Sequence, residues 1–341
     1  MKQEQAGIGQ WAILYAKILE IARLCPWQRP WADKPVSICL PGRRDVVYAR
    51  FTEEGPLQYI DFCLGDTALL DYEALRGAEP AQAAELTYLQ RCLSARLGPA
   101  EDLSGEDLEL IARMAPSFPW ESPPLRFRSY EPGYVPSFPS RRETALLIDL
   151  AEQLCEAIKD AAAGLVCPEE ALGEALCRRF DEASGAWRTE AAVPQPVRKK
   201  PAPLRMTDEL LPRRALQRPI VDAKLELDCF YLPHPVEDES FHKPYFPRVL
   251  ALADSRSGLI AAYESMTPAE TVSEKFQALI GAFLETYGRP LILYMSDPAL
   301  CALLGDYLDG LFFPWRQVAF LPAMDSFKLT RGISHLSDGA E

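Results

Sequence analysis

Hydrophobic positions in the first half of the chain alternate between helical and strand spacing. Apolar side chains three and four residues apart over 10–24 predict an amphipathic helix. Short β-prone runs follow, with Pro41-Gly42 as a turn between the first two, and they predict an antiparallel meander. The N-terminal part is therefore expected to be α+β with a helical end. The predicted strands are 36–40, 45–51 and 57–64, and the further helices are about 81–97, 106–114, 141–163 and 168–184.

The pattern after residue 220 predicts the order strand, strand, strand, helix, strand, helix, strand. The sequence Thr267-Pro268-Ala269-Glu270 has the form of a capping box and is expected to begin the first helix. Three consecutive strands favour a meander, and two strands that each follow a helix favour right-handed parallel crossovers. We expect an α/β domain with a mixed five-stranded sheet. Its strands are predicted at 224–232, 249–253, 259–263, 291–295 and 317–321, and its second helix at about 298–309.

A change of composition separates these two parts. Residues 191–219 contain six prolines and seven basic side chains against two acidic ones. Proline-rich segments of this kind are typical of extended linkers, although the same segment is also compatible with a basic patch for an anionic partner. The predicted organisation is an N-terminal domain over 1–190, a linker over 191–219 and a C-terminal domain over 220–341.

Charge and cysteine content narrow the class of protein. The formal net charge of −13 opposes general binding of nucleic acid, which depends on Lys and Arg neutralising phosphates. Nine scattered cysteines without a CxxC pair favour reduced, mostly buried thiols. The N-terminus lacks the features of a secretory signal, and no run of about 18 apolar residues is present. We expect a soluble, cytoplasmic protein that does not contact a membrane.

The C-terminal element order resembles the ribonuclease-H-like fold of retroviral integrases and many transposases. Short stretches of sequence are also similar to those enzymes: an aspartate in the first strand, a hairpin with Asp-Ser-Arg, a Thr-Pro-Ala-Glu-Thr helix start and a strand that ends in Ser-Asp. The resemblance covers about 100 residues. The matching stretches are 227–229, 253–261, 267–272 and 295–297.

Most of the chain also resembles a set of bacterial proteins known only as domains of unknown function. The N-terminal module of that set carries tryptophans and the pattern Phe-Arg-Ser-Tyr-x-Pro-Gly-Tyr-x-Pro, which stands here at 127–136. The C-terminal module has Gly-Arg-Pro before a strand, here at 288–290. This resemblance implies an uncharacterised two-module family and no particular activity.

The ribonuclease-H resemblance implies a catalytic role for several acidic residues. Enzymes of that fold use two metal ions about 3.5–4 Å apart, and Mg²⁺ or Mn²⁺ needs several converging carboxylates. Asp228 and Asp297 are the candidate metal ligands, with Glu274, or alternatively Glu270, from the first helix and Asp325 after the last strand. The alternative is that Asp228 is an ordinary strand residue and that Ser296 or Asp297 caps the helix beginning at Pro298. Ten basic against seventeen acidic residues in 216–341 are also unfavourable for a nucleic-acid groove.

Other candidate residues carry less specific patterns. The segment 117–140 is rich in proline and aromatic residues, and its Arg126, Arg128, Tyr130 and Tyr134 are candidates for a recognition surface. The alternative is a strap packed on its own domain. His234 and His242 flank an acidic loop and are a weak metal pair, with solvent exposure as the alternative. Cys167 and Cys177 lack a visible histidine partner, so burial is favoured over a nucleophilic role.

Two hypotheses about function follow. The first is a non-catalytic binding or adaptor protein with an unknown protein partner and no cofactor, since neither GxGxxG nor GxxxxGK[ST] occurs. The second is a metal-dependent phosphodiester-cleaving enzyme that uses Asp228 and Asp297 with Mg²⁺ or Mn²⁺. The incomplete carboxylate set and the acidic charge favour the first.

Overall fold

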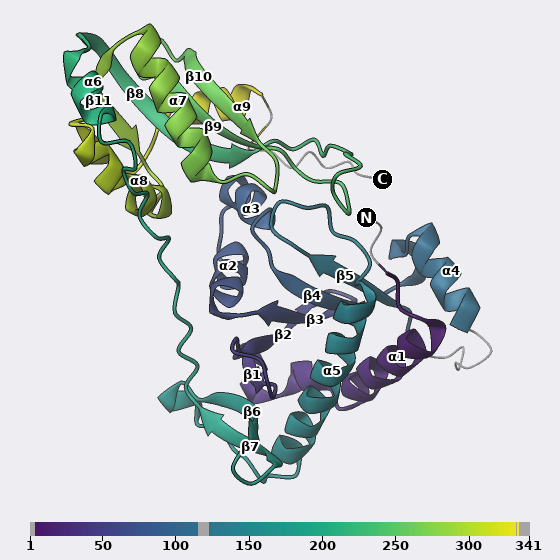
Figure 1. Ribbon diagram of the computed structural model, residues 1–341. Helices are drawn as coiled ribbons and strands as arrows, with labels where there is room; N and C mark the ends of the chain where they lie inside the picture. The colour runs from purple at the N-terminus through teal and green to yellow at the C-terminus, as the bar shows by residue number, and fades with distance from the viewer. Residues whose placement is uncertain (1–3, 115–122, 332, 334–341) are drawn as a thin grey trace. The chain divides into compact units, whose positions relative to one another are not determined.

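The structure is a computed structural model that describes residues 4–114, 123–331 and 333 (Figure 1). The chain divides into two compact units, each considered by itself. Two short segments from the N-terminal half, Gly77–Tyr88 and Gly133–Val135, belong to the second unit with Lys199–Glu341. The first unit contains Met1–Arg76, Leu89–Pro132 and Pro136–Arg198. The chain is mixed α/β, with a mixed sheet in each unit.

The first unit is built on a sheet that has seven strands in the described residues, in the order β5-β4-β3-β2-β1-β6-β7. All neighbouring strands are antiparallel except β1 and β6, which run parallel. The predicted meander is therefore present, and it lies inside a larger sheet. The strands are β1 (Val36–Cys39), β2 (Val47–Glu54), β3 (Leu57–Leu64), β4 (Cys92–Leu97), β5 (Leu125–Tyr130), β6 (Ala175–Asp181) and β7 (Ala186–Ala192).

Successive side chains along these strands point to opposite faces of the sheet. Ala49 and Phe62 pack with Leu14 of α1 and Leu147 of α5 in the main core. Tyr48 and Cys63, whose side chains point the other way, pack with Leu69 and Tyr72 of α2. The sheet is thus covered by helices on both faces. The helices of this unit are α1 (Ile8–Arg23), α2 (Asp66–Arg76), α4 (Gly105–Met114) and α5 (Arg141–Ala162), with short 3-10 turns at Pro26–Gln28, Pro30–Asp33, Ala100–Asp102 and Glu170–Leu172.

Two helix predictions in the N-terminal half of the chain are wrong, the first in part and the second entirely. The helix expected over about 81–97 ends at Thr87, and the buried strand β4 follows it. The helix expected over 168–184 is replaced by a 3-10 turn and strand β6, separated by Gly173 in the left-handed conformation with φ of 73°. Short apolar runs fit both the helical and the strand spacing, and here pairing with a neighbouring strand favoured the strand. Strand β5 was not predicted.

The second unit is built on a sheet with the order β10-β9-β8-β11-β12, which has five strands in the described residues. β8 pairs antiparallel with β9 and parallel with β11, β9 pairs antiparallel with β10, and β12 lies parallel to β11. The elements are α3 (Pro80–Thr87), α6 (Leu211–Gln217), β8 (Ile220–Tyr231), β9 (Arg248–Asp254), β10 (Ile260–Met266), α7 (Val272–Thr286), β11 (Arg289–Met295), α8 (Pro298–Gly310), β12 (Trp315–Gln317) and α9 (Pro322–Thr330).

Helices cover both faces of this sheet as well. Leu225 and Leu227 of β8 face the core formed with α7 and α8. Phe230 of the same strand faces the opposite side, where it packs with Ala323 and Met324 of α9. Glu226 and Asp228 alternate with the leucines, so β8 presents its acidic side chains to the face that α9 covers.

Four local features here differ from the predictions. α7 begins one turn later than expected, because Thr271 and Glu274 form its capping box. Thr267 and Glu270 are hydrogen-bonded to each other in the turn before the helix. The last strand lies at Trp315–Gln317 instead of 317–321, and α9 was not predicted. The predicted linker contains the end of β7 and all of α6.

Among the described residues, no helix is both long enough and apolar enough to cross a membrane.

Candidate functional site

The acidic face of β8 meets the first turn of α9. Glu226 is buried, and its Oε2 accepts a hydrogen bond from the backbone N–H of Met324 at 2.9 Å. The first turn of a helix carries unsatisfied N–H groups and the positive end of the helix dipole, so a carboxylate is stabilised there. Glu226 therefore anchors α9 to the sheet.

Lys328 lies one turn further along α9, in the middle of a group of carboxylates. Its Nζ donates to Oδ2 of Asp228 at 2.9 Å and to Oε1 of Glu85, in α3, at 2.7 Å. Oδ1 of Asp325 is 3.9 Å from the same nitrogen. The side chain of Lys328 is only 10% exposed, and that of Asp228 is 12% exposed. This arrangement, called the Lys328 cluster below, consists of Glu85, Asp228, Asp325 and Lys328.

The protonation state of Lys328 follows from these contacts. Burial alone would lower the pKa of the ammonium group. The charge of Asp228 and the hydrogen bonds to Glu85 and Asp228 more than offset this effect and raise the pKa of Lys328 above its ordinary value. Lys328 is therefore cationic at neutral pH. A lysine held in this state serves as a fixed counter-ion and does not act as a nucleophile or a general base.

The other acidic residues predicted for a metal site serve helix ends. Asp297 is the N-cap of α8, and its Oδ1 accepts from the backbone N–H of Ala299 at 2.8 Å. Glu274 accepts from Thr271 in the capping box of α7. Asp325 accepts from the N–H of Leu321 at the start of α9. The capping alternative for Asp297 is thus confirmed.

Asp228 and Asp297 both lie near the thiol of Cys229. Burial is the main cause that raises the pKa of Cys229 to about 12. The charge of Arg248 lowers this pKa, and the charges of Asp228 and Asp297 raise it further. Their carboxylates nevertheless make separate hydrogen bonds. Within the described residues, no group of three or more His, Cys, Asp and Glu side chains is placed to hold one metal ion. His234 is exposed, and His242 stacks on Tyr134 with ring centroids 4.8 Å apart.

The four residues predicted for a recognition surface are divided between the units. Arg128 is buried and forms a two-armed ion pair with Asp107, at 2.8 and 2.7 Å. Arg126 and Tyr130 are half-buried on the same strand, and Tyr130 packs against the core beneath α2. Tyr134 belongs to the second unit, where Lys243 lies 5.3 Å from its ring centroid. Residues 117–122 of the segment lie outside the described residues.

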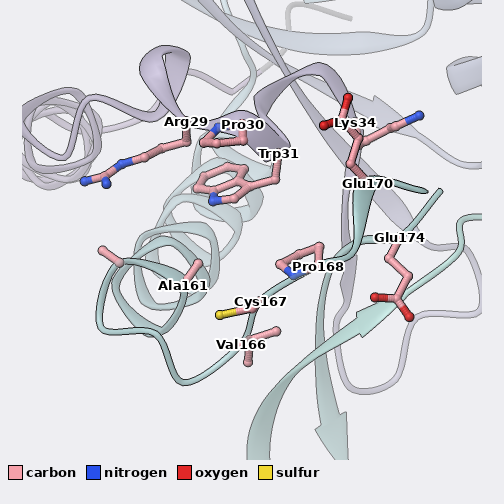
Figure 2. Close-up of a pocket in the computed structure, with 11 residues that line it drawn as sticks. Arg29, Pro30, Trp31, Lys34, Ala161, Val166, Cys167, Pro168, Glu170 and Glu174 are labelled. Carbon is pink, nitrogen blue, oxygen red and sulfur yellow. The ribbon is translucent and has the colours of Figure 1, made fainter. Parts of the chain in front are cut away.

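A separate cavity of about 260 Å³ lies in the first unit. Figure 2 shows the Trp31 ring and the Cys167 thiol bordering the same space, with Arg29 at one end and Lys34, Glu170 and Glu174 at the other. Glu174 accepts a hydrogen bond from the N–H of Glu169, and the Cys167 thiol donates to the Gly164 carbonyl. The charged rim and apolar walls define a space for a small molecule without specifying its chemistry.

Glu226 and Lys328 were missed by sequence reasoning. Glu226 had a signal, because two acidic residues two positions apart on a strand must share one face. Lys328 had none, since 100 residues separate it from Asp228 and its helix was not predicted.

Two comparisons with family models cover most of the chain. Residues 11–178 match a domain of unknown function (DUF7309), and residues 212–330 match a second domain of unknown function (DUF6930). No curated protein matches the chain. No solved structure matches it either. The chain is therefore similar to two uncharacterised modules joined in sequence, and its function is not given by any named relative.

Proposed function

We propose that this chain is a non-catalytic binding protein, an adaptor for a protein partner. The observation that carries the proposal is the Lys328 cluster: Asp228, the acidic residue most central to an enzymatic reading, is already paired with an ammonium group. The strand order β10-β9-β8-β11-β12 supports a ribonuclease-H-like domain over 220–341. We therefore propose a fold of that kind in which lysine has the place of a metal.

The cluster does not fit the two-metal chemistry of that fold. Magnesium binds oxygen ligands at about 2.0–2.1 Å and demands near-octahedral geometry. Lys328 Nζ is in direct contact with Asp228 and Glu85, so a divalent cation there would meet both a like charge and an occupied position. Asp297 and Glu274 are engaged at helix N-termini. We derive no phosphodiester cleavage from this arrangement.

A protein is the partner class that the charge of the chain favours. A net charge of −13 repels the phosphate backbone of nucleic acids, whose binding depends on cationic neutralisation. The predicted basic linker is the exception, because seven basic residues gather within 191–219. An acidic protein surface is the counterpart that such a segment would attract.

We expect calorimetric titration of the full chain with MnCl₂ to give no specific heat at millimolar metal, and Asp228→Ala to give the same flat titration. A hydrogen-bonded ammonium already neutralises Asp228, so the carboxylate has no free charge to offer. Single-stranded and duplex DNA cleavage assays with Mg²⁺ and Mn²⁺ accompany the titration. Saturable binding in the wild type that disappears in Asp228→Ala would overturn the non-catalytic assignment.

The binding half of the proposal needs its own measurement. The full chain is used to capture proteins from the cells that produce it, and a retained protein is then purified and titrated against it. A stoichiometric complex that weakens with rising salt is the expected result, because surface charge pairs are screened. A chain that forms no complex with any purified candidate contradicts the adaptor assignment.

A further inference from the structure

Two cysteines lie together on the central strands of the first unit. Cys39 ends β1, and Cys177 lies in β6, the strand that runs parallel to it. The register pairs Ser37 with Cys177 and Cys39 with Arg179, so Cys39 and Cys177 are diagonal neighbours on the same face of the sheet. Both are free thiols, Cys177 buried and Cys39 partly accessible. Neither takes part in the Lys328 cluster.

The two thiols lie close enough on neighbouring strands for each to influence the ionisation of the other. The interaction between them is the largest influence on the pKa of both groups. It lowers the pKa of Cys39 and raises that of Cys177, while the charge of Arg179 acts in the same sense on Cys39 and Glu190 opposes it. Arg179 and Glu190 form an ion pair at 3.4 Å beside the thiols. Tyr48, which donates to Asp66, borders the same pair.

We propose that Cys39 and Cys177 form a peroxide-reactive thiol pair, in which Cys39 is oxidised first and Cys177 then closes a disulfide between β1 and β6. The position of each residue suits its part. Cys39 is at the accessible end of a strand, where an oxidant reaches it. Cys177 is buried and remains a protonated thiol until Cys39 has been oxidised.

The chemistry balances with a hydroperoxide as oxidant. The Cys39 thiolate attacks the terminal oxygen of ROOH, so that an S–O bond forms, the O–O bond breaks and the alkoxide leaves to take a proton from water. The Cys177 sulfur then attacks the Cys39 sulfenic acid. The S–S bond forms, the S–O bond breaks, and the hydroxyl leaves with the thiol proton as water. The two cysteines lose two electrons, which reduce the hydroperoxide to an alcohol.

The disulfide requires a small local shift. β1 and β6 are parallel, and two residues along a strand span about 6.6 Å while neighbouring strands lie about 4.8 Å apart, so the two Cα atoms are roughly 8 Å apart. This separation exceeds the usual Cα span of a disulfide, about 4.4–6.8 Å. Cys39 is the last residue of β1 and precedes the Pro41-Gly42 turn, in which Gly42 has a φ of 72°. The movement therefore falls at a strand end and leaves the paired middle of the sheet in place.

The test uses hydrogen peroxide on the full chain at pH 6, followed by alkylation and peptide mapping. We expect Cys39 to be oxidised roughly tenfold faster than the exposed thiols of Cys25 and Cys167, because the thiolate is the reacting form. Cys39 and Cys177 should then appear in one disulfide-linked peptide. Oxidation rates are compared in the wild type, with fragmentation of the peptides to place each modified thiol. The disulfide is mapped in Cys25→Ser/Cys167→Ser, because Cys25 shares a tryptic peptide with Cys39 and Cys167 shares one with Cys177.

Single variants separate the two roles. Cys177→Ser should stop at a sulfenic acid on Cys39 that dimedone traps, and Cys39→Ser should leave Cys177 reduced. If exposure alone governs oxidation, Cys25 and Cys167 react first, and the proposal is wrong. Oxidation of Cys39 without linkage to Cys177 in the folded wild type also overturns it, whether or not the variants fold.

Discussion

Lys328→Met is expected to lower the free energy of unfolding of the second unit by about 3–5 kcal/mol, the range for removing one partner of a buried ion pair. Methionine fills a similar volume, so the loss measures charge more than packing. Without the ammonium group, Asp228 remains buried beside Glu226 and loses its ion pair with Lys328. The cost is the desolvated charge of Asp228 in addition to the lost hydrogen bonds.

The measurement is hydrogen exchange in peptides of β8 as a function of urea, which reports on the second unit alone. Lys275→Met is the matched control. Lys275 also contacts two carboxylates, Glu264 and Glu270, but these pairs lie at the surface of α7. Surface pairs of this type contribute little. Equal losses in the two variants would show that the Lys328 cluster is an ordinary surface network.

A double variant tests the electrostatic explanation directly. Asp228→Asn together with Lys328→Met removes both charges, and we expect it to recover most of the stability lost in Lys328→Met. The difference in free energy of unfolding between wild type and Lys328→Met should be constant from pH 6 to 9. Because the pKa of Lys328 is raised, its stabilising contribution is present below about 10.4, the ordinary lysine value, and is lost only as the pH rises through the higher folded value.

Local patterns predicted the elements of the second unit better than those of the first. Strands β8 to β11 carry apolar runs bounded by turn residues, and α7 carries two overlapping Thr-x-x-Glu patterns, of which the second caps the helix. In the first unit, β4 and β6 lie in the interior of the sheet, where long-range pairing overrides the helical spacing of short apolar runs. No pattern along the chain indicates that pairing.

The candidate site was half predictable for the same reason. Asp228 and Asp297 were singled out by the ribonuclease-H resemblance, and the proline that follows Asp297 indicated the alternative role as a helix cap. Whether these acids bind a metal or a neighbouring side chain depends on α9 and on Glu85, which reach β8 only through the tertiary fold. The chemistry of the site is therefore set by residues far away in sequence.

Arg128→Met is expected to cost the first unit a similar amount, about 3–5 kcal/mol, because it leaves Asp107 buried without its partner. The guanidinium group donates to both oxygens of Asp107 and to the carbonyl of Phe127 at 2.7 Å, and it lies 4.8 Å from the centroid of the Phe138 ring. Arg128→Lys should recover little of the loss, since an ammonium group cannot reproduce the two-armed geometry. The loss would identify Arg128 as a structural residue of the first unit instead of part of a recognition surface.

The dependence of this loss on pH is the sharper test. Burial raises the pKa of Asp107, but hydrogen bonds from Arg128 and Ser104 outweigh it and hold the folded pKa below the ordinary value. A carboxyl group with a depressed pKa adds stability that is present above about pH 4 and is lost as the pH falls through the folded value. The difference between wild type and Arg128→Met in urea unfolding should therefore be large at pH 7 and shrink toward pH 3. Arg96→Met, which breaks the more exposed pair with Asp102, is the control and should change stability much less. A loss in Arg128→Met that is as large at pH 3 as at pH 7 would attribute the effect to packing against Phe138 instead of to the ion pair.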